Sequence, residues 1–337
     1  MKSWKACIFA FFLLLSFSGS AQDVHFSQFY MNPVYLNPAL TGNFEGDWRF
    51  SANQRSQWRS VSRPFNTIAL SAENKEELLL PGLYHGINLF HDAAGDGNFR
   101  TIEMNVSTAF DIPLDLDSAH TITPAVQIGF NHRRIDFTQL NFDNQFNGFY
   151  YDPDLPTMET FETASRTGLS LSLGVAYKWQ IEPRKKIVAG LGWFNIPQAK
   201  QSFYGNELIE RDRRVSFHAK GGYDLNFEWD LQPGLFMQFQ GTYREIVFGS
   251  NVRYIYKDKK GEYIAPYAGL WFRNRDAIYA VVGAYYNNWI AGVSYDVNLS
   301  QLAPASNVRG GLEFSLQCML HVFKPSNIQH RICPDYL

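Results

Sequence analysis

The chain has 337 residues, of which 45% are hydrophobic, 16% are aromatic and only 18% are charged. Average soluble proteins carry about 25% charged residues, so this composition argues against both a disordered chain and an ordinary cytosolic enzyme. The 30 basic and 32 acidic residues leave a formal net charge of −2 at pH 7, which argues against a nucleic-acid partner.

The N-terminus has the pattern of a cleaved secretory signal. Lys2 and Lys5 precede an apolar stretch at residues 7–17, and the small residues at 18–21 supply a cleavage site. We therefore expect residues 1–21 to be removed after export. A membrane anchor is the alternative, but the apolar stretch is shorter than the roughly 20 residues that a spanning helix needs.

Residues 22–46 are predicted to form an N-terminal arm. They contain two Asn-Pro pairs, Asn32-Pro33 and Asn37-Pro38, which are five residues apart and flanked by aromatic residues. Because proline has no backbone donor and a fixed φ angle, the pairs predict two turns and exclude both a helix and a central strand. The arm either binds other proteins or packs as a rigid segment in or under the fold that follows.

From residue 47 onwards, apolar and polar residues alternate with a period of two, as in β-strands that have two different faces. In residues 168–179, the apolar residues occupy the odd positions, and small or polar residues occupy the even positions. Runs of this kind predict about 14 strands, at residues 47–54, 64–73, 83–91, 99–112, 120–135, 168–179, 186–195, 214–226, 229–240, 243–256, 263–273, 277–287, 289–297 and 309–322.

These runs favour a transmembrane barrel over a soluble sheet protein. Most have about ten residues or more, as a tilted spanning strand requires, whereas soluble strands average five or six. Charged residues in mid-strand, such as His218 and Lys220, suit a watery lumen, and aromatic residues cluster near strand ends as in interfacial girdles. We predict an all-β fold, a transmembrane antiparallel β-barrel over residues 47–322. The alternative is a soluble β-protein with these aromatic residues in its core.

Loop lengths predict the orientation of the barrel. With the N-terminus in the periplasm, the two longest connections, at residues 136–167 and 196–213, both face the outside. The connection at 136–167 is acidic and aromatic, and it could bind a passenger protein, fold into the barrel mouth or cap the surface. Residues 323–337 are predicted to form a periplasmic C-terminal tail.

The sequence predicts no catalytic, cofactor-binding or metal site. Residues 91–98 resemble a calcium-binding turn but lack the acidic residue that closes such a loop, so we interpret them as a polar hairpin. His218, Lys220 and Asp224 could form a hydrolytic group, but no nucleophile stands beside them. After removal of the signal only Cys318 and Cys333 remain, so no disulfide framework supports the fold, and their pairing stays open.

One segment is too particular for composition to explain. Residues 25–42, HFSQFYMNPVYLNPALTG, resemble the opening signature of the PorP/SprF family, which comprises outer-membrane proteins of the type IX secretion system and of gliding machinery. The likeness extends through residues 53–58, 292–296 and 312–316 to Cys333-Pro334. The chain departs from the usual assembly signal because it ends in a tail rather than in an aromatic residue that closes the last strand.

The resemblance implies a non-enzymatic barrel in the outer membrane, surrounded by lipid and working with the secretion machinery. Its partners would be periplasmic ring or translocon components and a secreted adhesin or effector. A passive porin or small-molecule transporter is the alternative function, and a membrane hydrolase is a weaker third one. The residues expected to contact proteins are His25, Phe26, Ser27, Gln28, Asn32, Pro33, Asn37, Pro38, Lys324, Arg331, Cys333 and Pro334.

Overall fold

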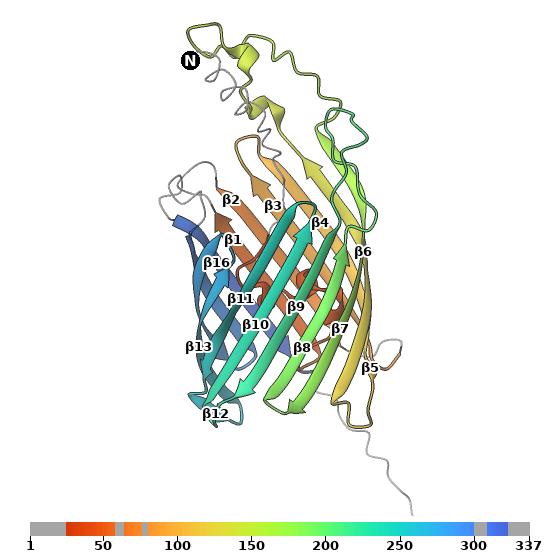
Figure 1. Cartoon of the computed structure of the whole chain (residues 1–337), viewed down its shortest axis with the longest axis vertical. Helices are drawn as coiled ribbons and strands as arrows, with labels where there is room; N and C mark the ends of the chain where they lie inside the picture. The colour runs from red at the N-terminus through yellow and green to blue at the C-terminus, as the bar shows by residue number, and fades with distance from the viewer. Residues whose placement is uncertain (1–24, 58–63, 76–79, 300–308, 323–337) are drawn as a thin grey trace, which may run out of the picture.

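The alternating segments of the sequence form the strands of a closed antiparallel barrel (Figure 1). The computed structural model describes residues 25–57, 64–75, 80–299 and 309–322. The 14 long strands are β1 (Trp48–Gln57), β2 (Phe65–Asn74), β3 (Leu83–Ala94), β4 (Phe99–Phe110), β6 (His120–Arg134), β7 (Ser165–Glu182), β8 (Lys185–Phe194), β9 (Arg214–Asp224), β10 (Trp229–Gln240), β11 (Tyr243–Tyr254), β13 (Glu262–Arg273), β14 (Ala277–Tyr286), β15 (Trp289–Asn298) and β16 (Arg309–Leu320). The predicted fold class is confirmed.

Each long strand pairs with its neighbours in the sequence, and β1 pairs with β16 to close the barrel. The closing register runs from Trp48 opposite Leu320 to Ser56 opposite Leu312. This closure supplies hydrogen-bond partners to the two strands that would otherwise be edges, which a barrel in lipid requires.

The two faces of the strands follow the alternation of the sequence. Leu169 and Leu173 of β7 are 61% and 43% exposed on the outer surface, whereas Ser172 between them is buried and faces the lumen. The same alternation holds in β4, where Ile102 and Met104 point outward. The apolar face of each strand is therefore the outer face of the barrel, as contact with lipid requires.

Strand boundaries differ from the prediction where the alternation weakens. β7 begins at Ser165 rather than at residue 168, because its polar first residues pair with the last residues of β6. Two short strands, β5 (Ile112–Pro113) and β12 (Lys257–Lys259), add to β6 and β13. Segments of two or three residues have no detectable period, so sequence patterning did not predict them.

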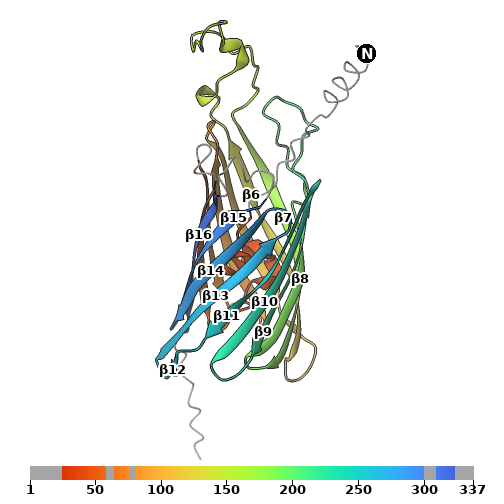
Figure 2. The same cartoon turned by 60° about the vertical axis from the view of Figure 1, so that its left-hand side comes forward.

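The two longest connections lie at one end of the barrel, although the two-residue turn between β10 and β11 is at that end too. The connections after β6 and β8, which are the longest, rise from the same end, and the first of them projects far beyond the strands (Figures 1 and 2). It contains two short turns, η3 (Phe137–Gln139) and η4 (Asp143–Gln145). The turns after β7, β9 and β14 lie at the other end, together with the start of β1 and the end of β16.

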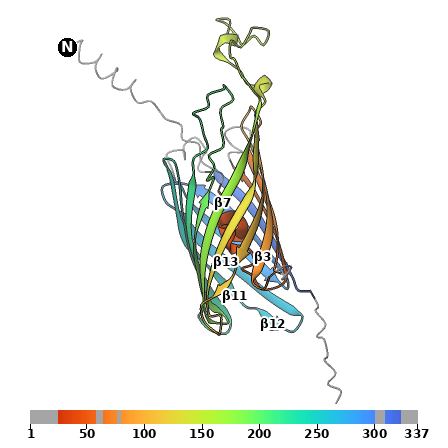
Figure 3. The ribbon, with the colours of Figure 1, turned by 90° about the vertical axis from the view of Figure 1, so that its right-hand side faces the viewer.

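The N-terminal arm lies inside the barrel (Figure 3). It contains three short helical elements, η1 (Phe29–Met31), α2 (Pro33–Leu36) and η2 (Pro38–Leu40). In the part of the chain that the structure describes, no helix has the length and apolar character needed to cross a membrane.

Candidate functional site: a lumen filled by the N-terminal arm

The Asn-Pro pairs begin two successive helical turns of the arm. Asn32 Oδ1 accepts a hydrogen bond from Tyr35 N (3.4 Å) and Asn37 Oδ1 accepts one from Ala39 N (2.9 Å), while a proline occupies the first position of each turn. The two predicted turns are confirmed. The predicted absence of helix was wrong for α2, because proline at the first position starts a helix rather than breaking it.

The first residues of the arm are held by a carboxylate of the last strand. Glu313 of β16 accepts hydrogen bonds from the backbone N–H groups of Ser27 (2.6 Å) and Gln28 (2.9 Å). The hydroxyl of Tyr279 donates to the carbonyl oxygen of Ser27 at 2.8 Å. All four residues are buried, so these charge-assisted bonds fix this point of the arm without competition from bulk water.

A buried arginine links that carboxylate to a second one, and another buried arginine also pairs with the second. Arg55 of β1 pairs with Asp296 (2.6 Å) and Glu313 (3.2 Å), and Arg273 of β13 pairs with Asp296 (3.1 Å). The Ser27 hydroxyl donates to Asp296 at 2.7 Å and accepts from both guanidinium groups. Each buried charge thus has several partners that offset the cost of its desolvation. We call Arg55, Arg273, Asp296 and Glu313 the upper anchor.

His25 lies beside the upper anchor. Its Nδ1 is 4.0 Å from Glu245 Oε1, and the same carboxylate oxygen is 3.0 Å from Arg273 Nε. Burial, together with the positive charges of Arg273 and Arg55, holds the pKa of His25 well below its usual range. The imidazole is therefore neutral at neutral pH and adds no further positive charge to the site.

Asn37 fixes the middle of the arm to the backbone of the wall. Its Nδ2 donates to the carbonyl oxygens of Val175 of β7 and Leu191 of β8, both at 3.2 Å. Gly174 and Gly190 lie beneath the amide: a Cβ at Gly174 would come within 2.2 Å of Asn37 Oδ1, and one at Gly190 within 2.7 Å of Nδ2. Only glycine leaves room for so close an approach of the arm.

Aromatic side chains of the arm pack against strands β10 and β13 of the wall. The ring of Phe29 stacks on Phe236 of β10, with centroids 5.3 Å apart, and meets Trp271 of β13 edge-on at 5.4 Å. Tyr30 stacks on the same tryptophan at 5.4 Å, and Lys220 Nζ lies 5.0 Å from the centre of the tyrosine ring. These contacts give the arm an apolar core of its own inside a polar lumen.

A second ionic site holds the end of the arm. Arg49 of β1 makes two bonds of 2.7 Å with the carboxylate of Glu73 of β2, and its guanidinium also donates to the carbonyl oxygens of Leu40 (3.1 Å) and Asn43 (3.2 Å). Glu73 accepts in turn from Gly42 N at 3.1 Å. We call Arg49 and Glu73 the lower anchor. The arm is therefore bound by buried ion pairs at both ends of its path through the lumen.

His218, Lys220 and Asp224 do not form the hydrolytic group considered from the sequence. His218 is buried beside the arm rather than exposed to a watery lumen, because the arm fills the barrel at this level. Lys220 lies over an aromatic ring of the arm, and Asp224 pairs with Lys185 at 3.5 Å. Two gaps beside the arm have volumes of about 20 and 10 Å³, which is room for a water molecule and not for a substrate.

Residues 91–98, which resemble a calcium-binding turn, form the end of β3 and the turn into β4, with Ala94 opposite Phe99. The predicted hairpin is confirmed. Asp92 points inward and accepts a hydrogen bond from the Thr67 hydroxyl at 2.7 Å. Within the described ranges, no group of three or more His, Cys, Asp or Glu side chains could hold a metal ion.

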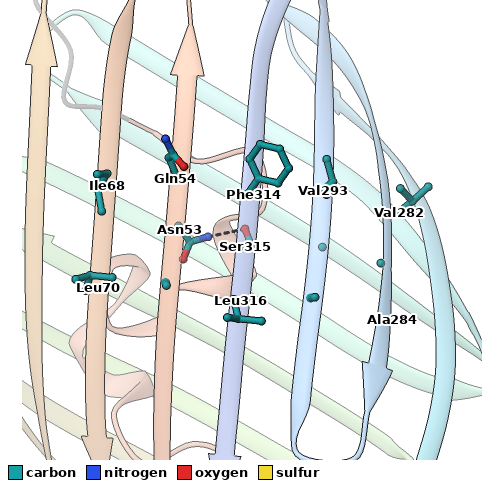
Figure 4. A pocket seen from close by; sticks show the side chains of 14 residues that line it. Asn53, Gln54, Ile68, Leu70, Val282, Ala284, Val293, Phe314, Ser315 and Leu316 are labelled. Atoms are coloured by element: carbon teal, nitrogen blue, oxygen red, sulfur yellow. Dashed lines mark hydrogen bonds between the residues drawn. The ribbon is translucent and has the colours of Figure 1, made fainter.

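The outer wall of the barrel carries a shallow apolar groove of about 580 Å³ (Figure 4). Ten outward-facing residues line it in two rows across β2, β1, β16, β15 and β14: Ile68, Gln54, Phe314, Val293 and Val282 in one, and Leu70, Ala52, Leu316, Ala291 and Ala284 in the other. The three alanines of the second row create the depression. Its position on the outer face makes it a place for acyl chains of the membrane.

A comparison with protein-family models gives a match that covers both the arm and the barrel. Residues 18–317 match the model for the type IX secretion system membrane protein PorP/SprF. The chain belongs to the PorP/SprF family. The resemblance of residues 25–42 to that family is thereby confirmed, while a search of curated proteins found no match.

Solved structures are similar to this PorP/SprF barrel at low sequence identity. The toluene transporter TbuX of Ralstonia pickettii is 12% identical, with a TM-score of 0.51 over 86% of this chain and 93% of its own. The toluene transporter TodX of Pseudomonas putida is 11% identical, with a TM-score of 0.48 over 84% of this chain and 92% of its own. At such identities the likeness to TbuX shows the outer-membrane barrel fold alone.

The protein-contact residues predicted for this PorP/SprF member fall into two groups. Those of the arm are buried and contact the barrel of the same chain, as in the packed-arm alternative: His25, Phe26, Ser27, Gln28, Asn32, Pro33, Asn37 and Pro38. Those of the tail, Lys324, Arg331, Cys333 and Pro334, lie outside the described residues, and so does the pairing of Cys333 with Cys318.

Sequence reasoning did not predict the upper anchor. Arg55, Asp296 and Glu313 stand in three segments that resemble the PorP/SprF family, yet Arg55 is 241 residues from Asp296 and 258 from Glu313. The sequence does show charged residues on the lumen-facing side of predicted strands. This pattern identifies residues that could form buried ion pairs, but it does not indicate which of them come together when the barrel closes.

Proposed function

We propose that this protein is a non-enzymatic outer-membrane component of the type IX secretion or gliding machinery that supports the export or surface attachment of a secreted protein. Membership of the PorP/SprF family supports this role. The observation that carries the proposal is a lumen filled by the protein's own arm and held by the two anchors. A barrel filled in this way suits a component of a secretion machine that binds other proteins at its two ends.

The rival function, a passive porin or small-molecule transporter, needs a path through the lumen. The arm occupies that path from the upper anchor, where Glu313 binds its first residues, to the lower anchor, where Arg49 binds its last. Two gaps beside the arm, one lined by His25 and Phe29 and one by Tyr35 and Arg211, have volumes of about 20 and 10 Å³, each room for one water molecule. The closed lumen therefore supports the secretion role over free diffusion.

The proposal includes an orientation. In outer-membrane barrels short turns face the periplasm and long loops face outward. With cleavage after residue 21, the short-turn end and the tail at 323–337 would face the periplasmic machinery, and Lys324 and Arg331 would supply positive charge for that contact. The connections at 135–164 and 195–213 would then face the cell exterior.

Deletion of the gene in its own host tests the proposal. We expect one or a few large secreted proteins to disappear from the cell surface and culture fluid, and the wild-type gene to restore them. Quantitative mass spectrometry of both fractions provides the measurement, and proteins that co-purify with the detergent-extracted barrel identify the partner. Unchanged secretion combined with a loss of small-molecule uptake would refute the secretion role.

A further inference from the structure

The connection between β6 and β7, residues 135–164, stands away from the barrel mouth (Figures 1 and 2). An aromatic cluster supports its base: Phe161 stacks on Phe137, with centroids 3.5 Å apart, and contacts Tyr204 of the connection after β8 at 4.9 Å. Glu162 N donates to the carbonyl oxygen of Phe203 at 2.9 Å. The two long connections therefore support each other, and none of these three contacts involves the far end of the connection between β6 and β7.

That far end, residues 143–158, is called the aromatic tip below. Its own hydrogen bonds define its shape: Asp152 N donates to Gln145 O (2.8 Å), and Gln145 Nε2 donates to Leu155 O (3.2 Å). The side-chain oxygen of Asn147 accepts from the backbone N–H groups of Phe149 (3.0 Å) and Tyr150 (3.1 Å). Polar and backbone groups thus build the tip, which leaves its aromatic rings free for other contacts.

Those rings face solvent. Phe149 is 92% exposed, Tyr150 is 62% exposed and Phe146 is 57% exposed. Scattered apolar residues are normal on a surface, but a group of them on a structured loop marks an interaction site. The tip lies well beyond the ends of the long strands, so the bilayer that surrounds the barrel does not cover it.

The charge of the tip indicates what kind of partner fits. Residues 143–158 contain three carboxylates and no lysine, arginine or histidine. Asp143 and Asp154 are exposed, and within the described ranges no cationic side chain pairs with either. The phosphates of an outer leaflet would be repelled, whereas a basic partner would be attracted electrostatically and could place cations on the aromatic faces.

We propose that the aromatic tip docks the exported protein through a segment that combines basic and apolar side chains. The identity of the partner rests on the proposed function and on its orientation. Lysine or arginine side chains of the segment lie against Asp143, Asp154 and the face of Tyr150, and its apolar side chains cover Phe146 and Phe149. The segment needs both its basic and its apolar side chains. An exposed aromatic group alone would also fit a lipid surface, and exposed carboxylates alone would also fit a simple cation.

Peptide binding to the purified full-length protein tests the chemistry. The probes are a peptide of alternating lysine and leucine, its glutamate–leucine counterpart and its lysine–serine counterpart. We expect the lysine–leucine peptide to bind about tenfold more tightly than either counterpart, and less tightly as salt is raised. The double variants Phe149→Ser/Tyr150→Ser and Asp143→Asn/Asp154→Asn should each remove most of this preference.

The matched control is Leu116→Ser/Asp117→Asn, which removes an exposed apolar and an exposed acidic side chain from the turn at the opposite end of the barrel. It should bind as the wild type does, and circular dichroism should show the same strand content in every variant. Equal binding by wild type and tip variants would overturn the proposal. Binding of a neutral oligosaccharide that only the aromatic substitutions abolish would also overturn it, in favour of a glycan.

Secretion by the host separates the two hypotheses. If gene deletion blocks export and the tip variants block it as well, both the proposed function and the docking site are supported. If deletion blocks export but the tip variants restore it fully, the docking site is wrong and the secretion role stands. If deletion leaves export unchanged, the proposed function itself fails, and the exported protein is no longer the partner.

Discussion

Glu313 receives two backbone N–H groups of the arm and the guanidinium of Arg55 in a part of the lumen where its side chain is fully buried. Glu313→Gln keeps the shape of the side chain but removes its negative charge. Its amide NH₂ group would also face N–H groups of the arm and of Arg55, which need an acceptor. Breaking one partner of a buried ion pair costs about 3–5 kcal/mol, because the remaining charge loses its compensation. We expect the free energy of unfolding, measured by urea titration of the barrel in detergent, to fall by about that amount.

The matched substitution Glu262→Gln removes the same charge from a pair that water reaches. Glu262 binds Lys257 at 2.5 Å, and both side chains are partly exposed. Such pairs contribute no more than about 1 kcal/mol, since the two ions remain hydrated without each other. If the two variants lose equal stability, the upper anchor is no stronger than a surface ion pair and cannot be what holds the arm.

At the scale of the elements, the strands and their antiparallel barrel could be predicted, whereas the register between strands and the side-chain contacts across it could not. The period of two is a local property, so residues 168–179 indicated the core of β7 without any knowledge of its neighbours. Its polar first residues, from Ser165, were missed because they carry no apolar alternation. The anchors are not local at all: closure of the barrel brings Arg55 of β1 to Glu313 of β16, and no pattern within either strand specifies that contact.

The arm and the wall depend on each other through Gly174. Gly174→Ala would place a methyl carbon 2.2 Å from Asn37 Oδ1 and 3.0 Å from Ala39 N, so the arm must move away from β7. We expect the bonds that Asn37 makes to the wall to weaken, while the strands themselves persist. Hydrogen–deuterium exchange of peptides from residues 25–42 should become about tenfold faster, and exchange of the strands should not change.

Gly222→Ala is the control for this substitution. Gly222 lies on the lumen-facing side of β9, but its added Cβ would meet only wall atoms, Arg184 O at 3.4 Å and Lys186 Cγ at 3.7 Å. These are ordinary contact distances, so the arm should exchange at the wild-type rate. Equal exchange in both variants would mean that crowding at Gly174 is relieved by the wall rather than by the arm.

At the scale of the whole molecule, the sequence left one question open that the closed barrel answers. The turns at Asn32-Pro33 and Asn37-Pro38 are shaped by asparagine and proline residues of the arm itself, so they do not indicate whether the arm binds another protein or packs in the lumen. What distinguishes a packed arm from a protein-binding arm is the set of glycines and ionic residues that several strands place around the arm once the barrel has closed. The structure places the arm inside, so the surfaces left for other proteins are the two ends of the barrel.

Ion conductance of the purified protein in planar bilayers tests whether the arm closes the path. We expect the wild type to conduct little, and a variant lacking residues 25–42 to show large, stable openings because the strands that form the wall remain. Arg273→Ala, which weakens the upper anchor without removing the arm, should open only intermittently. A variant lacking the aromatic tip, residues 143–158, should stay closed, since that segment projects away from the mouth. If the wild type conducts as strongly as the arm deletion, the arm leaves an open channel and the passive porin becomes the better description of the molecule.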